Sequence, residues 1–210
     1  MISEAALASL IAALFSMMNP IGNVGVFAGM TTDRSRSEAT RIAWTCAGAI
    51  AVTLLIMTWS GSMMLDFFGV TVDSLRAAGG VIVLLIGLQM LFNKSGHKES
   101  YAELEDAQTR ESIAVVPLAI PLVAGPGTMV TVLVATQQHP SVLSKVEISV
   151  IVVALAALTG LFFSFAAPIA KHLGAAGIGV VTRVMGMILT AIAMGLLTSG
   201  LKGMLPGLAA

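Results

Sequence analysis

The chain has 210 residues, of which 57% are hydrophobic and 10% are charged, and its mean hydropathy is +0.95. This composition excludes an ordinary water-soluble domain and predicts an integral membrane protein with lipid around it. Eleven basic and eleven acidic residues balance each other, so no polybasic patch points to nucleic acid as a partner. The single cysteine, Cys46, excludes an internal disulfide and a cysteine-rich metal cluster.

Six apolar stretches approach or exceed the roughly 20 residues that a helix needs to cross a bilayer core of about 30 Å. They cover residues 5–30, 42–62, 74–92, 113–138, 147–167 and 180–201. We therefore predict an all-α membrane protein with six transmembrane helices. The first stretch has no lysine or arginine before Arg34, so it lacks the basic head of a secretory signal and is expected to remain as a helix.

The first stretch, residues 5–30, is interrupted near its centre by Asn19-Pro20-Ile21-Gly22-Asn23. At about 26 residues, or roughly 39 Å, it is long for one upright span. Lipid offers no partners to freed backbone groups, so a broken helix survives only where protein or a watery cavity satisfies them. Pro20 suits the first turn of a helix and Asn19 suits the cap before it. We expect two half-helices, broken at Asn19–Pro20.

The fourth stretch, residues 113–138, has a related break at Gly125-Pro126-Gly127-Thr128. Pro126 is expected to begin a second half-helix here as well. Pro117 and Pro121 remove two further helical donors ahead of it, so the first half must be kinked or partly unwound. A re-entrant hairpin is the alternative for this stretch.

The longest polar segment separates two halves of three spans each. We expect a solvated cytoplasmic linker at residues 93–112, between a first repeat at 1–92 and a second at 113–210. Eight of the eleven basic residues fall on the linker's side of the predicted topology, which places both termini in the periplasm. These residues are Arg34, Arg36, Arg41, Lys94, Lys98, Arg110, Lys171 and Arg183.

Matched landmarks indicate that the two halves are repeats. Arg76 and Arg183 each open a span in the frame Arg-x-x-Gly and are 107 residues apart, while Pro20 and Pro126 are 106 apart. Because three spans is an odd number, the second copy enters from the opposite face, which gives two inverted three-helix repeats. The alternative is that proline, glycine and arginine coincide by chance in a glycine-rich chain.

The two breaks predict a binding site for a small zwitterionic amino acid. A helix start carries about half a positive charge and suits a carboxylate, while carbonyls freed at a break can accept from an ammonium group. The glycines let a ligand approach the backbone, and Asn23 and Thr128 add side-chain donors and acceptors. The candidate substrate-binding residues are Asn19, Pro20, Gly22, Asn23, Gly125, Pro126, Gly127 and Thr128.

Charged residues elsewhere give weaker signals. Arg76 and Arg183 lie at equivalent depths of the two halves, where they either gate the two sides or anchor a helix start. No Asp, Glu, Lys or His lies near the centre of a predicted span, so the coupling ion is not visible. His139 and His172 fall in short predicted loops, and we expect no metal, cofactor or catalytic group. The oligomeric state is left open.

Four segments make the chain resemble the MarC family of bacterial membrane proteins, and within it the branch similar to the small neutral amino acid transporter SnatA. They are residues 19–23, 68–80 (FGVTVDSLRAAGG), 116–127 (VPLAIPLVAGPG) and 182–186 (TRVMG). The resemblance runs nearly end to end. It implies a six-span inner-membrane protein and, for that branch, proton-coupled movement of glycine, alanine and similar amino acids.

We therefore expect a secondary transporter of small neutral amino acids that works by alternating access. One alternative is an exporter of drugs or other apolar compounds, which would need a wide aromatic-lined pocket. Only eleven aromatic residues occur in the chain, which disfavours it. The other alternative is a non-transport scaffold in a membrane complex, for which paired breaks have no evident purpose. An enzyme is not expected, because the spans hold no recognisable nucleophile or acid–base pair.

Overall fold

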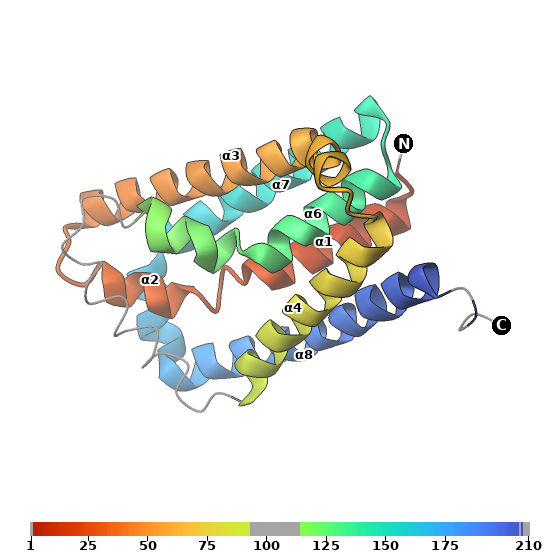
Figure 1. Cartoon of the computed structure of the whole chain (residues 1–210). Coiled ribbons are helices and arrows are strands. Elements are labelled where there is room, and N and C mark those ends of the chain that lie inside the picture. The colour runs from red at the N-terminus through yellow and green to blue at the C-terminus, as the bar shows by residue number, and fades with distance from the viewer. Residues whose placement is uncertain (1, 93–113, 206, 208–210) are drawn as a thin grey trace.

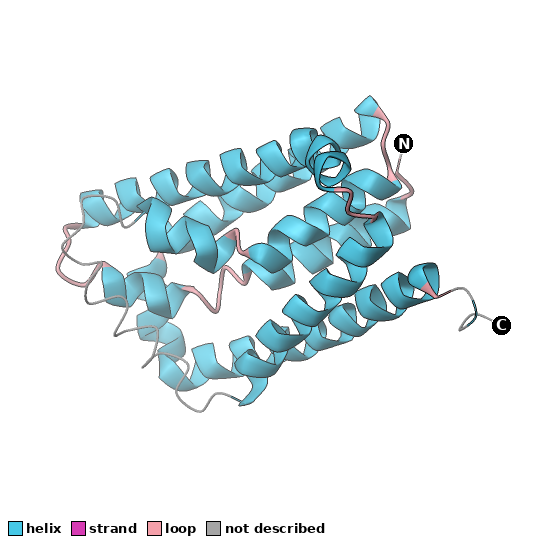
Figure 2. Cartoon of the chain, in the orientation of Figure 1, coloured by secondary structure: helices cyan, strands magenta, loops and turns pink. Residues whose placement is uncertain are grey.

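The computed structural model describes residues 2–92, 114–205 and 207. These residues form helices and connecting loops, with no strand among them (Figures 1 and 2). In chain order they are α1 (Glu4–Met18), α2 (Val24–Met30), α3 (Arg36–Phe68), α4 (Val72–Phe92), the π-helix η1 (Ala114–Val123), α6 (Pro126–Gln138), α7 (Val142–Ser164) and α8 (Ala166–Met204). The predicted linker, residues 93–112, lies outside the described residues.

Four of the helices, α3, α4, α7 and α8, are long and apolar enough to cross a membrane. They occupy the second, third, fifth and sixth predicted spans. The first and fourth predicted spans are each divided, into α1 and α2 and into η1 and α6. The all-helical architecture is therefore confirmed for the described residues, with four helices that could cross a membrane. The count of six crossings stays a prediction.

Helix α3 begins well before the apolar stretch that predicted it. A reciprocal capping box fixes its start, because the Ser35 hydroxyl accepts from the Glu38 amide at 3.3 Å and the Glu38 carboxylate accepts from the Ser35 amide at 2.9 Å. Gly69 ends the helix in the left-handed conformation, with φ 64°. Hydropathy detects only the apolar middle of such a helix, so the predicted range, 42–62, was too short.

The predicted loop between the fifth and sixth spans is wrong. Lys171 and His172 lie within α8, which follows α7 after a single turn residue, Phe165. The chain bends instead at Gly174, whose φ of 61° and ψ of 175° interrupt the helical geometry of α8. A positive φ suits glycine, so one residue makes the bend that a loop was expected to make.

The buried side chains form two separate cores. The larger core holds α1, α2, α3, η1, α6 and α7 together with the start of α8 at Ala166, and the smaller core joins α4 to the later part of α8 through Val83, Leu189 and Ala193. Figure 1 shows α4 and α8 as a pair below the other helices. The protein therefore consists of a main bundle and a helix pair packed against it.

Glycines allow the two helices of this pair to touch closely. A Cβ atom on Gly80 of α4 would come within 2.7 Å of the Leu197 backbone nitrogen, and one on Gly186 of α8 within 2.9 Å of the Met90 Cβ. The order of these contacts shows that α4 and α8 run antiparallel. Close approach through small residues is a common way for helices to associate in membranes, where the surrounding lipid is itself apolar.

The helices that pack together occupy equivalent positions in the two predicted repeats. Helix α4 packs along α8 and α3 along α7, while α4 contacts α6 as α8 contacts α2. The chain enters α1 and leaves α8 at one end of the molecule, and α4 ends and η1 begins at the other (Figure 1). A two-fold relation between the halves would produce these pairs, but the inverted repeat itself stays a prediction.

Candidate functional site

Asn19 ends α1 in the left-handed conformation, with φ 41° and ψ 55°. Asparagine tolerates this region better than most residues, because its short polar side chain can bond locally. Its own amide donates to the Phe15 carbonyl at 2.9 Å, and its side-chain oxygen accepts from the Gly22 amide at 3.2 Å. Asn19 thus closes one helix and caps the turn that follows, and the predicted break of the first span is confirmed.

The second half-helix does not begin at Pro20 as predicted. Residues 20–23 form a turn, and α2 begins at Val24. The Val24 amide donates to the carbonyl of Ile21, three residues earlier, at a distance of 3.2 Å. The α-helical pattern of bonds to the fourth residue back resumes when the Phe27 amide donates to the Asn23 carbonyl. The hydrogen-bond register slips by one residue at this point, which delays the regular helix.

The break of the fourth span takes the predicted form. Its first half, η1, is wound as a π-helix, and the Ala124 amide bonds five residues back to the Ala119 carbonyl at 2.8 Å. Gly125 is extended, and α6 begins with Pro126 in its first turn. A proline there loses no helical bond, because the first four amides of a helix have no partner within it.

The same side-chain hydrogen bond closes both breaks. The Asn23 side-chain amide donates to the Met18 carbonyl at 3.0 Å, and the Thr128 hydroxyl donates to the Val123 carbonyl at 2.9 Å. Each donor lies five residues after its acceptor, and each acceptor is the last residue of a first half-helix. Two side chains expected to face a ligand therefore satisfy carbonyls that the breaks set free.

The two breaks lie against each other. The Thr131 hydroxyl of α6 approaches the Met17 sulfur of α1 to 3.0 Å, and it also bonds the Gly127 carbonyl at 3.0 Å. A Cβ atom on Gly127 would lie 3.9 Å from the same sulfur. The last turn of α1 therefore meets the first turn of α6. Figure 1 shows the two broken segments running antiparallel, with their loops in the middle of the molecule.

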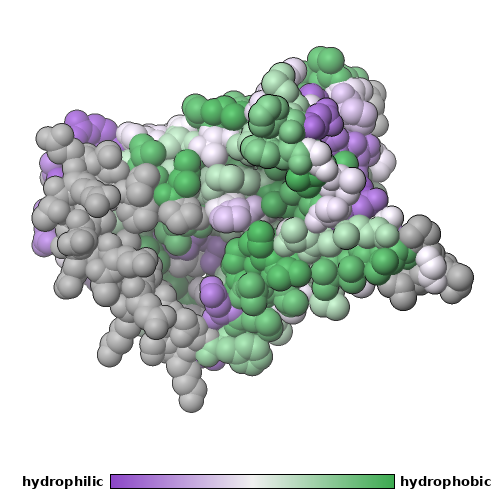
Figure 3. Space-filling view, in the orientation of Figure 1, coloured by the Kyte–Doolittle hydropathy of each residue, from purple (hydrophilic) through white to green (hydrophobic). Residues whose placement is uncertain are grey.

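Helix ends of both polarities converge at this point. The carboxyl ends of α1 and η1 present carbonyls, and the amino ends of α2 and α6 present amides without a side-chain cap. Among the predicted site residues, Asn23 is half-buried, Pro126 is exposed and the remaining ones are buried. Figure 3 shows hydrophilic residues in a recess between α4 and the helices above it, where Figure 1 has the loop that joins α1 to α2.

Gly22 and Gly127 have packing roles that the sequence did not suggest. A Cβ atom on Gly22 would lie 2.6 Å from the Asn19 side-chain carbon, so the glycine makes room for that cap. A Cβ atom on Gly127 would lie 3.1 Å from a methyl group of Val83, so this glycine lets α4 pack on the first turn of α6. Close approach of a ligand to either glycine stays a prediction.

Arg76 and Arg183 are placed differently from each other. Arg76 donates to the Asp73 carboxylate of its own helix at 2.7 Å, beside the carboxyl-terminal part of α8, where a Cβ atom on Gly200 would meet the Asp73 backbone. Arg183 is exposed on α8. Gating by either residue stays a prediction. Within the described ranges, no group of three or more His, Cys, Asp and Glu side chains could hold a metal ion.

Sequence reasoning missed Met17 and Thr131, which join the two breaks. One signal was available for Thr131, because it follows Thr128 by three residues and so shares a face of α6 with it. Met17 carries no such signal, since its neighbours Phe15 and Met18 are equally apolar. Only the pairing of α1 with α6 identifies it.

Comparison with known proteins places the chain in one family. The model of the MarC family integral membrane proteins matches residues 5–205. The UPF0056 membrane protein YvbG of Bacillus subtilis is 35% identical over 195 residues, which is 92% of each chain. The UPF0056 membrane protein YhcE of Escherichia coli is 34% identical over 196 residues, 93% of this chain and 91% of the relative. No solved structure matches the chain.

Proposed function

Since the chain belongs to the MarC family of integral membrane proteins, we propose that it is a secondary transporter of small neutral amino acids that works by alternating access. The observation that carries the proposal is the meeting of two interrupted helices inside the protein, where Met17 contacts Thr131. Interrupted helices at membrane depth are tolerated only inside protein or beside a watery cavity. In many transporters a pair of them forms the substrate site.

The chemistry of the site suits a zwitterion. The Gly127 and Thr128 amides belong to the first turn of α6, whose partial positive charge would attract a carboxylate. The Met18 and Val123 carbonyls each accept one side-chain bond, and each keeps a second lone pair for an ammonium group. Because buried backbone surrounds both groups, glycine and alanine are the substrates that fit best.

The division into two cores supports alternating access. Helix α4 covers the first turn of α6 through Val83, which would lie 3.1 Å from a Cβ atom on Gly127. Val83 also belongs to the small core shared with α8. Movement of the α4–α8 pair relative to the main bundle would therefore uncover one side of the site and cover the other. Such movement of one bundle around a fixed site is the common transport mechanism of repeat-built carriers.

The energy source and the membrane are also part of the proposal. We infer proton coupling and a location in the bacterial inner membrane from the resemblance to the SnatA-like branch, and periplasmic termini from the distribution of basic residues. A pH gradient across sealed vesicles tests the coupling, because it should drive accumulation of substrate that an uncoupler abolishes. Uptake unchanged by the gradient would exclude coupling to protons and leave the transport proposal standing.

Transport is tested with purified protein in liposomes and labelled glycine and alanine. We expect saturable uptake or exchange, which Asn23→Ala should lower by about tenfold because it leaves the Met18 carbonyl without its donor. The matched control is Gln89→Ala, at an exposed position of α4, which should keep full activity. If folded protein moves none of the small neutral amino acids, the proposal is wrong.

A further inference from the structure

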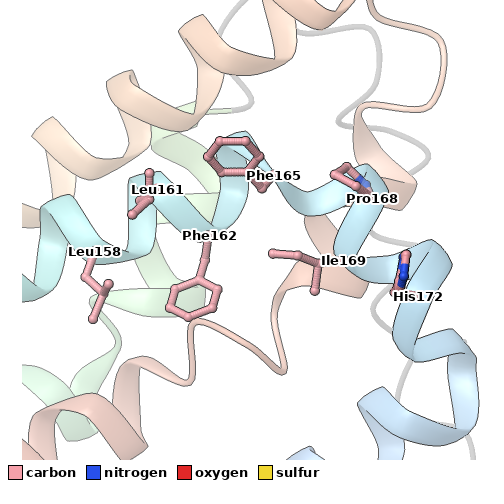
Figure 4. A pocket seen from close by; sticks show the side chains of 7 residues that line it. All are labelled: Leu158, Leu161, Phe162, Phe165, Pro168, Ile169 and His172. Atoms are coloured by element: carbon pink, nitrogen blue, oxygen red, sulfur yellow. The ribbon is translucent and has the colours of Figure 1, made fainter.

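An open groove of about 490 Å³ lies where α7 meets α8, and its lining includes none of the residues at the helix breaks. It falls in the size range of small-molecule sites. Figure 4 shows its lining, with Phe162 and Ile169 extending into the groove from the two sides of the bend and His172 at the end on α8. The lining residues are Leu158, Leu161, Phe162, Phe165, Pro168, Ile169 and His172.

Two bends of the backbone flank the groove. Phe165 turns the chain between α7 and α8, with φ −106° and ψ 18°, and Gly174 bends it again eight residues into α8. The short segment between the bends leans away from the axis of α7. The lining residues recur at intervals of three and four, so a single helical face continues across the turn and lines the concave side.

The floor of the groove is fixed and its rim is open. Leu158, Phe162 and Ile169 pack against the main core, which holds the floor in place. Leu161 and Phe165 on the rim are each 47% exposed. In a membrane protein, such an apolar surface faces lipid, so the hydrocarbon of the bilayer has direct access to the groove.

A lysine adjoins the histidine at one end of the groove. Lys171 is exposed and precedes His172, the one lining residue with an ionisable side chain. The sequence contains no aspartate or glutamate after Glu147, so α8 supplies no carboxylate to neutralise Lys171. In the part of the chain that the structure describes, the ion pair present joins Asp73 to Arg76. Among the described residues, Lys171 is thus an exposed cation next to the His172 end of the groove, without an ion-pair partner.

We propose that the groove binds one acyl chain of an anionic phospholipid of the bilayer, with the lipid phosphate beside Lys171 and His172. The apolar floor accepts the hydrocarbon chain, and the basic end selects the headgroup. A zwitterionic phospholipid offers the same chain but no net charge, so headgroup charge should decide affinity. A basic residue near a membrane surface contributes about a fivefold preference for anionic lipid. This site is independent of the proposed transport activity.

Fluorescence quenching by brominated lipid tests the site. The native Trp44 and Trp59, both on α3, are replaced by phenylalanine, and Phe162→Trp places the reporter in the groove. The full-length protein is reconstituted in vesicles that contain either phosphatidylglycerol or phosphatidylcholine with brominated chains. We expect about fivefold tighter apparent association of the brominated phosphatidylglycerol with the reporter. Equal quenching by the two lipids would overturn the proposal.

Matched charge variants locate the selectivity. Lys171→Gln should abolish the preference for phosphatidylglycerol, whereas Lys202→Gln, at the exposed far end of α8, should preserve it. Loss of the preference in both variants would indicate general surface charge, and a reporter shielded from both lipids would show that protein fills the groove. Either result overturns the proposal.

A thermal-stability measurement tests the same site without the tryptophan reporter, in case the reporter variant does not fold. The otherwise unmodified protein in detergent should be stabilised against heat by added phosphatidylglycerol and not by phosphatidylcholine, and Lys171→Gln should remove the difference. If phosphatidylglycerol stabilises both proteins equally, Lys171 does not select the lipid and the proposed site is wrong.

Discussion

Thr128→Val removes the hydroxyl that closes the second helix break while keeping the shape of the side chain. Thr128 is 3% exposed, and its hydroxyl donates to the Val123 carbonyl at 2.9 Å. Val123 is the last residue of η1 and is fully buried. A carbonyl at the end of a helix has no partner within the helix, so the variant leaves a buried acceptor without this donor.

The expected cost follows from that missing donor. A buried polar group left unsatisfied costs about 1–3 kcal/mol in proteins generally, and side-chain hydrogen bonds measured in a membrane protein reach about 1.7 kcal/mol. We expect a loss of about 1–1.5 kcal/mol in the free energy of unfolding. For a chain of this size, that corresponds to a fall of roughly 2–6 °C in the melting temperature.

Thermal unfolding in detergent, followed by intrinsic fluorescence, measures this loss. The matched control is Thr198→Val, because Thr198 is exposed and its hydroxyl bonds to the Met194 carbonyl in the middle of α8 at 2.8 Å. A carbonyl inside a helix already accepts a backbone hydrogen bond, so the control should change the free energy of unfolding by less than about 0.5 kcal/mol. An unchanged melting temperature for Thr128→Val would refute the role assigned to the hydroxyl.

Three further substitutions test the packing of the helices and the anchoring of the start of the chain. Gly80→Ala should destabilise the protein by about 1–3 kcal/mol because its methyl group meets the α8 backbone, whereas Gly195→Ala meets nothing within 4 Å; equal melting temperatures would contradict this. Phe27→Ala should cost about 3–5 kcal/mol by removing a buried ring stacked on α7, and Phe67→Ala, 82% exposed, should cost little in the same unfolding assay. Glu147→Ala removes the carboxylate that accepts a hydrogen bond from the Ile2 amide at 3.0 Å, so hydrogen exchange at the start of the chain should become faster. Unaltered exchange would show that this bond does not hold the start of the chain in place.

The sequence alone determined the environment and the positions of the breaks. Apolar stretches of about 20 residues predict membrane helices because of the thickness of the bilayer, and four of them are present as continuous helices. Proline and glycine act through the backbone itself, so the interruptions at Asn19 and Gly125 could be placed without knowing any neighbour. Even the partial unwinding of η1 followed from two missing proline donors.

Only the tertiary structure decided how those elements are used. Met17 meets Thr131, and Gly80 brings α4 onto α8, yet nothing in hydropathy distinguishes these helix faces from those that contact lipid. A membrane helix is apolar on the side that packs and on the side that meets lipid, so the amphipathic pattern that identifies the core of a soluble protein is missing. The groove beside Phe165 likewise depends on a bend that the sequence did not place.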